Sequence, residues 1–341
     1  MNYAQTLTHL IERQDLPFAE MRELMHHIMG GQFTTAQIAA VLVALRMKGE
    51  TVDEIAAAAE VMRELSSKVN VTHTDHLIDT CGTGGDGAQT FNISTASALV
   101  AAAAGAHVAK HGGRSVSSKC GSADVLEKLG VNVNLTPERV AHSVDSIGVG
   151  FMFAPNHHSA MKHAAPVRRE LGVRTLFNML GPLTNPAGAQ NQVIGVFSRA
   201  LTARLANVLS TLGSSHVLVV HGSDGMDEIS ISSPTFVAEL KGGKVNEYSI
   251  QPEQFGLMPA PLNAIQVSDA DEAKDMLLKV LDNQPGAARD IVLLNAGAAI
   301  YVGGLASSLA EGVKKAADVI ANGAARHKLA QLVEVSNEGI A

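Results

Sequence analysis

Short apolar segments alternate with helical segments along most of the chain, and this alternation restricts the fold more than any other feature. Helices are expected over 94–104 and 123–129, and Thr136 followed by Pro137 is typical of a helix start. The alternation predicts an α/β fold in which helices cover both faces of a mostly parallel central sheet. A local hairpin is expected over 236–250. The predicted strands are 77–80, a strand ending at 107–110, 131–133, 149–153, 192–197, 216–220 and 291–295.

The first 68 residues lack this alternation and predict helices alone. Apolar residues recur with helical spacing over 18–28, and Thr51 with Glu54 has the spacing of a capping box. A length of 341 residues suggests about two domains. The expected domains are a small all-helical N-terminal domain over 1–69 and a larger α/β domain over 70–341, with the aperiodic segment 166–186 returning to the helical domain.

Composition excludes several classes of protein. With 46% hydrophobic residues the chain can bury a large core, and a net charge of −7 argues against a broad surface for nucleic acid or anionic membrane. Cys81 and Cys120 cannot form a disulfide framework, which is typical of a reducing compartment. No signal peptide is recognisable, and the weakly polar run 94–109 is shorter than the roughly 20 residues of a membrane span. We therefore expect a cytoplasmic protein.

A glycine-rich loop, 81–87, directly follows the strand predicted at 77–80. Glycines allow backbone N–H groups to surround an anion, and the helix that opens at Asn92-Ile93-Ser94-Thr95 offers further N–H groups. The Gly-Lys-Ser/Thr ending of a Walker loop is missing, and the spacing does not match the dinucleotide-binding Gly-x-Gly-x-x-Gly pattern. The pattern favours a phosphate site, although a tight turn with a helix cap would look similar.

A second polar loop, 110–122, also follows a predicted strand. It contains three cationic residues, four serines and three glycines, so it can bind several phosphate oxygens. A basic loop can also be merely solvated. Because both loops follow strands of one predicted parallel sheet, we expect them to meet at the edge where such sheets bind ligands.

Two further segments carry candidate functional groups. Asp227-Glu228 lies on a glycine loop after the strand 216–220, and paired carboxylates of this kind suit Mg²⁺ that is also bound by substrate phosphates. An exposed acidic turn is the alternative. In 154–169 an arginine could bind a carboxylate through two hydrogen bonds, although a helix with surface arginines is equally consistent. The spacing of its three histidines does not predict a transition-metal site.

Taken together, these segments resemble the anthranilate phosphoribosyltransferase family over nearly the whole length of the chain. One loop alone would also match the pyrimidine nucleoside phosphorylases. The resemblance implies transfer of the phosphoribosyl group from phosphoribosyl diphosphate to the amine of anthranilate, in tryptophan biosynthesis, by a homodimer that uses Mg²⁺. The motifs in the family's order are Gly82–Asp86, Asn92–Thr95, Lys110–Gly112 running to Gly121–Asp124, Val167–Gly172, Phe177–Pro186 and Asp227-Glu228.

The same resemblance implies roles for individual residues. Mg²⁺ would be served by Ser94, Asp227 and Glu228, and His111 is the candidate proton acceptor. The expected anthranilate-binding residues are Gly82, Gly113 and Arg168, with His111, Ala154, Pro155 and Asn178 nearby. The expected phosphoribosyl diphosphate-binding residues are Gly82, Gly85, Asp86, Thr90, Asn92, Ile93, Ser94, Thr95, Lys110, His111, Gly112, Gly113, Arg114, Ser115, Val116, Ser117, Ser118 and Ser122.

One position departs from the family pattern, and two alternative functions stay open. The family more often has asparagine where this chain has Gly113, so an amide contact to anthranilate is missing or replaced. A pyrimidine nucleoside phosphorylase would need no paired carboxylates for diphosphate-bound Mg²⁺, so Asp227 and Glu228 argue against it. A non-catalytic nucleic-acid-binding relative of the same fold would have a basic cleft, which the net charge of −7 disfavours.

Overall fold

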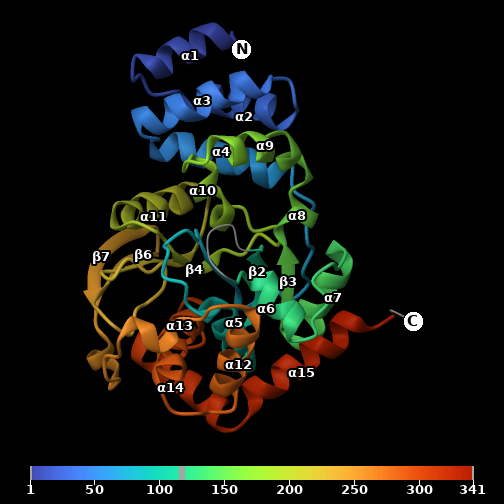
Figure 1. The fold of residues 1–341 in the computed structure, drawn as a ribbon, viewed down its shortest axis with the longest axis vertical. Helices are drawn as coiled ribbons and strands as arrows, with labels where there is room; N and C mark the ends of the chain where they lie inside the picture. The colour runs from blue at the N-terminus through green and yellow to red at the C-terminus, as the bar shows by residue number, and fades with distance from the viewer. Residues whose placement is uncertain (1, 115–119, 340–341) are drawn as a thin grey trace.

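The computed structural model describes residues 2–114 and 120–339. Four helices form the N-terminal part of the molecule, at the top of Figure 1. The capping box predicted at Thr51 is confirmed: Thr51 Oγ1 accepts the Glu54 N–H at 3.2 Å, and the Glu54 carboxylate accepts the Thr51 N–H at 2.8 Å. These helices are α1 (Tyr3–Ile11), α2 (Phe18–Met29), α3 (Thr35–Lys48) and α4 (Val52–Glu64).

The larger part of the molecule is built on one seven-stranded sheet with the order β3-β2-β1-β4-β5-β6-β7. The pairs from β3 to β5 are parallel, and β6 and β7 form the predicted antiparallel hairpin. The α/β fold predicted from the sequence is therefore confirmed. The strands are β1 (Leu77–Gly82), β2 (His107–Gly112), β3 (Val149–Phe153), β4 (Asn191–Gly195), β5 (His216–Gly222), β6 (Thr235–Lys241) and β7 (Lys244–Ile250).

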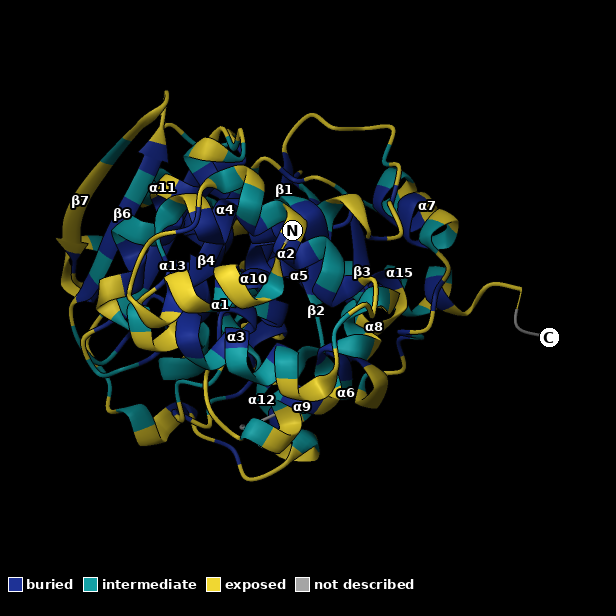
Figure 2. Cartoon of the chain, turned by 90° about the horizontal axis from the view of Figure 1, so that it is seen from above, coloured by how far each residue is buried: buried dark blue, intermediate teal, exposed yellow. Residues whose placement is uncertain are grey.

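Helices cover both faces of this sheet. Val193 on β4 packs into the core formed with α5 and α13, whereas its neighbour Ile194 packs into the core formed with α11 and the N-terminal helices, because successive strand residues point to opposite faces. The central strands are buried and the edge strand β7 is exposed (Figure 2). The other helices of the α/β part are α5 (Ile93–Ala103), α6 (Ser122–Lys128), α7 (Pro137–Ile147), α11 (Thr202–Thr211), α12 (Ala270–Leu281), α13 (Ala287–Val302), α14 (Leu309–Ala321) and α15 (Ala324–Asn337).

Between β3 and β4 the chain runs back against the N-terminal helices, where α9 lies beside α4 in Figure 1. Val167 and Phe177 from this segment share one core cluster with the N-terminal helices. The Arg63 Nε–H of α4 also donates to the Leu183 carbonyl at 2.7 Å. This returning segment contains α8 (Ala154–His157), α9 (Ala165–Leu171) and α10 (Phe177–Leu180).

Two predicted strands are wrong. Residues 291–295 lie inside α13, which is buried on nearly every side, and a short uniformly apolar run does not distinguish a buried helix from a buried strand. Residues 131–133 form no strand; Val131 and Val133 are buried, but the Asn132 N–H donates to the Ser336 hydroxyl of α15 rather than to a sheet neighbour.

Over 2–114 and 120–339, no helix is both long enough and apolar enough to span a membrane.

Candidate active site

The glycine loop lies at the C-terminal end of β1, between β2 and β4, where the strand order reverses. Open α/β sheets bind ligands at such a reversal. The Thr83 N–H donates to the Gly195 carbonyl at 2.9 Å, so the loop continues along β4 before it turns away. Gly84, Gly85 and Gly87 have φ values of 65°, 76° and 75°, a region that side-chain-bearing residues rarely adopt. The glycines therefore shape the turn.

The acidic pair lies directly against this loop. The Gly84 N–H donates to Asp227 Oδ2 at 2.7 Å, and the Asp227 N–H donates to Asp86 Oδ2 at 3.3 Å. Gly82 leaves room for the Asp227 carboxylate, because a Cβ atom there would lie 2.5 Å from Asp227 Oδ2. The structure thus brings together two of the segments singled out in the sequence.

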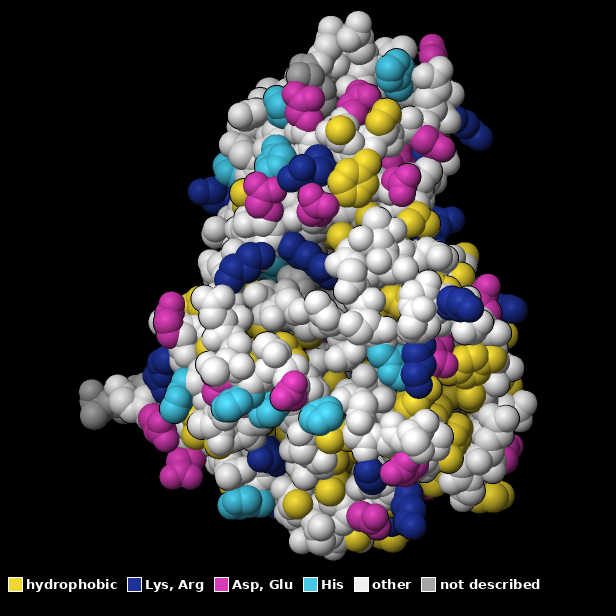
Figure 3. Space-filling view, turned by 180° about the vertical axis from the view of Figure 1, so that it is seen from behind, with side chains coloured by type: hydrophobic (Ala, Val, Ile, Leu, Met, Phe, Trp, Pro, Cys, Tyr) yellow, Lys and Arg dark blue, Asp and Glu magenta, His cyan; other side chains and the backbone are white. Residues whose placement is uncertain are grey.

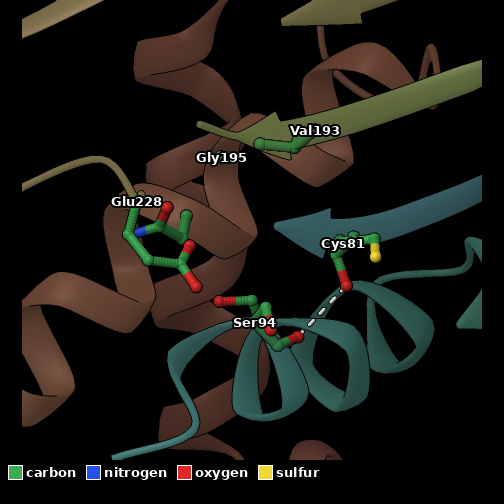
Figure 4. Close-up of a pocket in the computed structure, with 8 residues that line it drawn as sticks. Cys81, Ser94, Val193, Gly195 and Glu228 are labelled. Carbon is green, nitrogen blue, oxygen red and sulfur yellow. Dashed lines mark hydrogen bonds between the residues drawn. The ribbon is translucent and has the colours of Figure 1, made fainter. Parts of the chain in front are cut away.

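Lys110 and Ser94 join the first loop to the second and to Glu228. The Lys110 ammonium donates to Ser94 Oγ at 3.2 Å and to the Thr80 carbonyl, and the Ser94 backbone opposes the rise in the pKa of Glu228. Glu228 and Ser94 approach a small pocket from different elements (Figure 4). The pocket has a volume of about 10 Å³ and is lined by Thr80, Cys81, Ser94, Ser97, Val193, Gly195, Glu228 and Asn295.

The carboxyl groups of Asp227 and Glu228 are difficult to ionise. Burial raises the pKa of Glu228 to about 8, the Asp86 carboxylate adds to this, and the Lys110 ammonium opposes it. Burial and then the Asp86 and Glu228 carboxylates raise the pKa of Asp227 well above its ordinary value. A cation bound at this position would relieve both the desolvation and the repulsion.

This set of oxygen ligands fits Mg²⁺. Mg²⁺ is usually bound by one or two carboxylates, with waters and substrate phosphates completing its coordination. Asp227, Glu228 and the Ser94 hydroxyl supply such a partial set. In the part of the chain that the structure describes, no cluster of three or more His, Cys, Asp or Glu side chains is arranged to hold a metal on its own.

His111 is buried and uncharged at the end of β2. Its Nδ1 lies 3.2 Å from the Gly181 carbonyl, so Nδ1 carries the proton and Nε2 is left as an acceptor. Burial, with the nearby His158 and His157 rings, lowers the pKa of His111 to about 3. Nε2 has no hydrogen-bond partner among the described residues. The ring can accept a hydrogen bond, but it is too weak a base to keep a proton at neutral pH.

Arg168 is half-buried on α9, with its guanidinium 5.5 Å from the centre of the Phe177 ring. Burial lowers the pKa of Arg168, and no acidic side chain of the described residues forms a salt bridge with it. A carboxylate ligand could therefore pair with it. Of its predicted neighbours, Ala154 and Pro155 begin α8, and Asn178 Oδ1 accepts the Thr175 N–H at 2.9 Å.

Other predicted site residues have partners within the protein. Arg114 is bound to Asp124 at 2.8 Å and to Glu127 at 2.7 Å, so its guanidinium is already paired. Ile93 and Thr95 are each 1% exposed, which leaves only their backbone available to a ligand. Thr90 forms an isolated β-bridge with Gln266, and the Asn92 side chain donates to the Cys120 carbonyl. Ser122 is the first residue of α6 and lies beside Gly112. A Cβ atom at Gly113 would meet no other atom within 4 Å. Ser115, Val116, Ser117 and Ser118 lie outside the described residues.

Sequence reasoning missed Arg174. Its guanidinium donates to the Gly85 carbonyl of the glycine loop and lies 4.1 Å from the centre of the Phe197 ring. It therefore ties the segment that follows α9 to the first loop. The only signal in the sequence is a single arginine in an aperiodic segment.

Lys and Arg side chains also gather on the rear face, at the boundary between the helical and α/β parts (Figure 3).

Known proteins resemble the chain over nearly its whole length. A family described as the glycosyl transferase family, a/b domain, matches residues 74–326, and one described as the glycosyl transferase family, helical bundle domain, matches residues 4–66. The anthranilate phosphoribosyltransferase of Nitrosomonas europaea is 60% identical over 99% of both chains. That of Thiobacillus denitrificans is 64% identical over 98% of this chain and 97% of its own length.

Solved structures are similar over the same length. Anthranilate phosphoribosyltransferase from Thermus thermophilus superposes with a TM-score of 0.92 at 44% identity, covering 97% of this chain and 99% of its own. The enzyme from Saccharomyces cerevisiae, in complex with PRPP and Mg, superposes with a TM-score of 0.90 at 25% identity, covering 98% of both chains.

Proposed function

Because the chain belongs to the anthranilate phosphoribosyltransferase family of glycosyl transferases, we propose that the site at the end of β1, β4 and β5 is where it carries out that family's reaction. Phosphoribosyl diphosphate and anthranilate give N-(5-phosphoribosyl)anthranilate and diphosphate, a step of tryptophan biosynthesis. One observation carries the assignment to this site: the Gly84 N–H of the anion-binding loop donates to Asp227 of the acidic pair. A phosphate group on the loop would therefore lie beside carboxylates that suit Mg²⁺.

The protein's own groups would bind the anionic end of phosphoribosyl diphosphate. Backbone N–H groups of 82–87 and of the first turn of α5 provide donors, and Lys110 provides positive charge. The other residues proposed for this substrate are Gly85, Asp86, Thr90, Asn92, Ser94 and Thr95, followed by His111 to Ser118 and Ser122. Arg174 holds the Gly85 carbonyl and so keeps the loop in place.

The Mg²⁺ site would consist of Asp227, Glu228 and Ser94. Bound Mg²⁺ supplies positive charge that stabilises the departing diphosphate. As the bond from the ribose C1 to diphosphate breaks, C1 becomes cation-like and the aryl amine attacks it. Since an aryl amine is nucleophilic without prior deprotonation, positioning and electrostatics suffice. The product proton can pass to water, consistent with the low basicity of His111.

Anthranilate would lie between the glycine loop and the returning segment. Arg168 is assigned to its carboxylate because the guanidinium is half-buried and forms no salt bridge with an acidic side chain of 2–114 or 120–339. Gly82, Gly113, Ala154, Pro155 and Asn178 would complete the site. At Gly113 the missing asparagine amide would be replaced by a backbone or water contact.

The proposed organisation of the protein follows the family pattern. We propose a helical domain over 1–69, an α/β domain over 70–341 and a homodimer. The homodimer is proposed from the family resemblance. Light scattering coupled to size-exclusion chromatography measures the oligomeric state.

A cytoplasmic location is proposed from the two free cysteines, Cys81 and Cys120.

A fluorescence assay tests the proposed function. Anthranilate fluorescence should fall when the protein, phosphoribosyl diphosphate and Mg²⁺ are all present, and it should stay constant when any one of them is left out. Phosphorolysis of uridine and thymidine is measured in parallel. Turnover of these nucleosides without anthranilate consumption would reject the proposal in favour of a nucleoside phosphorylase.

A further inference from the structure

Asn295 on α13 holds both backbone groups of Ile229, the residue after Glu228. Asn295 Oδ1 accepts the Ile229 N–H at 2.9 Å, and Asn295 Nδ2 donates to the Ile229 carbonyl at 2.9 Å. The second Nδ2 hydrogen is donated to the Ile291 carbonyl, also at 2.9 Å. The side chain is 2% exposed, so all these bonds are made away from water. Both Nδ2 hydrogens are used, and the orientation of the amide is therefore fixed.

These bonds are one of two anchors that enclose Glu228. On the other side, the Asp227 N–H donates to Asp86 Oδ2, and the Asp227 carbonyl lies against Gly195, where a Cβ atom would be only 1.5 Å away. The backbone is thus held immediately before and immediately after Glu228. Asn295 also lines the pocket that receives the Glu228 side chain, which Figure 4 shows between the strands and the helices.

The acidic segment needs such anchors because its neighbouring carboxyl groups repel one another when ionised, and this repulsion favours movement of the segment toward solvent. Asp227 and Glu228 are adjacent and only partly exposed, and the Asp86 carboxylate lies beside them, accepting the Asp227 N–H. Desolvation and mutual repulsion would be relieved if the segment moved outward into water. The Gly84 N–H donates to Asp227 Oδ2 at 2.7 Å, but one such bond does not satisfy three neighbouring carboxyl groups. The backbone contacts must therefore help to hold the segment in place.

We propose that Asn295 is a positioning residue for the Mg²⁺ site: by fixing the backbone of Ile229 it directs the Glu228 carboxylate toward the cation. This inference rests on the proposed function. Asn295 contacts neither substrate nor cation. Its removal leaves the Ile229 N–H and carbonyl unpaired in the interior, and the segment regains these bonds only by moving toward solvent. The result is a weaker cation site in a folded protein.

The test measures cation binding as well as activity. The full-length protein is titrated with Mn²⁺ in place of Mg²⁺ in the presence of phosphoribosyl diphosphate, and bound Mn²⁺ is quantified by electron paramagnetic resonance. N295A should weaken Mn²⁺ binding on the order of tenfold, as removal of groups that orient metal ligands typically does. N295D keeps an acceptor for the Ile229 N–H but loses both donors, and it should fall between wild type and N295A.

Asn191→Ala is the matched control. Asn191 at the start of β4 also donates from its side chain to a backbone carbonyl, that of Leu77, at 3.2 Å, but it lies at the opposite end of the strand from Gly195. N191A should bind Mn²⁺ within about twofold of wild type. Circular dichroism establishes that each variant is folded, and if N295A does not fold, N295D is judged by the same criterion.

The outcomes separate this inference from the proposed function. Wild-type Mn²⁺ affinity in a folded Asn295 variant overturns the positioning role. An equal loss in N191A also overturns it, because the effect would then be one of general stability. If wild-type protein itself binds no Mn²⁺ with phosphoribosyl diphosphate, the proposed function fails, and the positioning role fails with it.

Discussion

The Cβ position of Gly195 lies 1.5 Å from the carbonyl oxygen of Asp227, so the end of β4 and the acidic segment touch backbone to backbone. No side chain fits at Gly195 unless Asp227 moves. The glycine therefore fixes how closely the acidic segment can approach β1 and its anion-binding loop.

The first prediction concerns this contact. Gly195→Ala should displace Asp227, reduce the rate of phosphoribosyl transfer by at least about a hundredfold and lower the free energy of unfolding by about 3 kcal/mol. Anthranilate fluorescence and urea unfolding measure the two effects. Gly113→Ala is the control for stability, since its added Cβ meets no atom within 4 Å. A G195A variant with normal turnover would show that the contact is not needed.

The second prediction concerns the pH dependence of cation binding. The pKa of Glu228 is raised to about 8, chiefly by burial, and Mg²⁺ binds the ionised carboxylate. The apparent affinity for Mg²⁺ should therefore rise as the pH increases toward 8 and level off above it. Calorimetric titration with phosphoribosyl diphosphate present, from about pH 6.5 to 9, measures this change across the raised pKa. Glu228→Gln should bind weakly and lose the part of the pH dependence that comes from Glu228, leaving that of Asp227, whereas an unchanged profile would contradict a role for Glu228.

The third prediction concerns the acceptor site. Arg168→Ala should raise the KM for anthranilate on the order of tenfold to a hundredfold, because a charge-assisted pair with the carboxylate is lost, and it should change the KM for phosphoribosyl diphosphate much less. Steady-state kinetics with each substrate varied in turn provides the comparison. The exposed neighbour Arg169 gives the control variant, R169A. Equal effects on both substrates would reject the assignment of Arg168.

The fourth prediction concerns Arg174. Arg174→Ala removes the hydrogen bond to the Gly85 carbonyl and the contact with the Phe197 ring. The KM for phosphoribosyl diphosphate should rise about fivefold, which corresponds to roughly 1 kcal/mol. Arg199→Ala is a suitable control because Arg199 lies 3.8 Å from the centre of the Phe236 ring and also loses an arginine–aromatic contact. If R199A and R174A behave alike, the tie to the glycine loop has no kinetic role.

The fifth prediction concerns stability in acid. Glu239 accepts hydrogen bonds from His216 at 2.8 Å, Tyr301 at 2.8 Å and Tyr248 at 2.9 Å, and the bond from His216 is the main reason that its pKa is lowered to about 2. A carboxyl group with a lowered folded-state pKa contributes stability that is fully present above its unfolded pKa of about 4.5 and is lost as the pH falls through about 2.

Glu239→Gln should therefore lower the free energy of unfolding at pH 7 by on the order of 2 kcal/mol, and the difference from wild type should shrink between about pH 4.5 and pH 2. Urea unfolding across this range measures the difference. Glu247→Gln, at an exposed position on β7, should have little effect at any pH. A constant difference between E239Q and wild type would contradict the lowered pKa.

Much of the fold was predictable from local pattern. The spacing in 216–220 and the helix start at Thr136 depend on neighbours in sequence, so they could be recognised without coordinates. The run 291–295 could not, because a helix packed on every side has no polar face to reveal its period. The pattern consequently places Asn295 in a strand and gives no sign of its contact with Ile229.

The site was predictable to the extent that its residues lie on loops after strands. Gly82, Asp86 and Asp227 meet because parallel strands end at one edge of the sheet, which is a property of topology. The pairing of Arg114 with acidic side chains of α6 and the approach of Arg174 to the glycine loop depend on side-chain conformations that no spacing rule contains. The partial burial of Glu228, which makes its carboxyl group difficult to ionise, likewise exists only after the chain has folded.

The returning segment between β3 and β4 packs on the N-terminal helices, so these helices cannot be deleted without exposing part of the α/β half of the chain. Val167 and Phe177 belong to the α/β half of the sequence but to the core of the N-terminal helices. A chain trimmed to begin at residue 70 would expose these apolar side chains, together with the segment that carries Arg168 and Arg174. Excision of the first four helices would thus disrupt the acceptor side of the site, and the two parts could exchange with those of relatives only together.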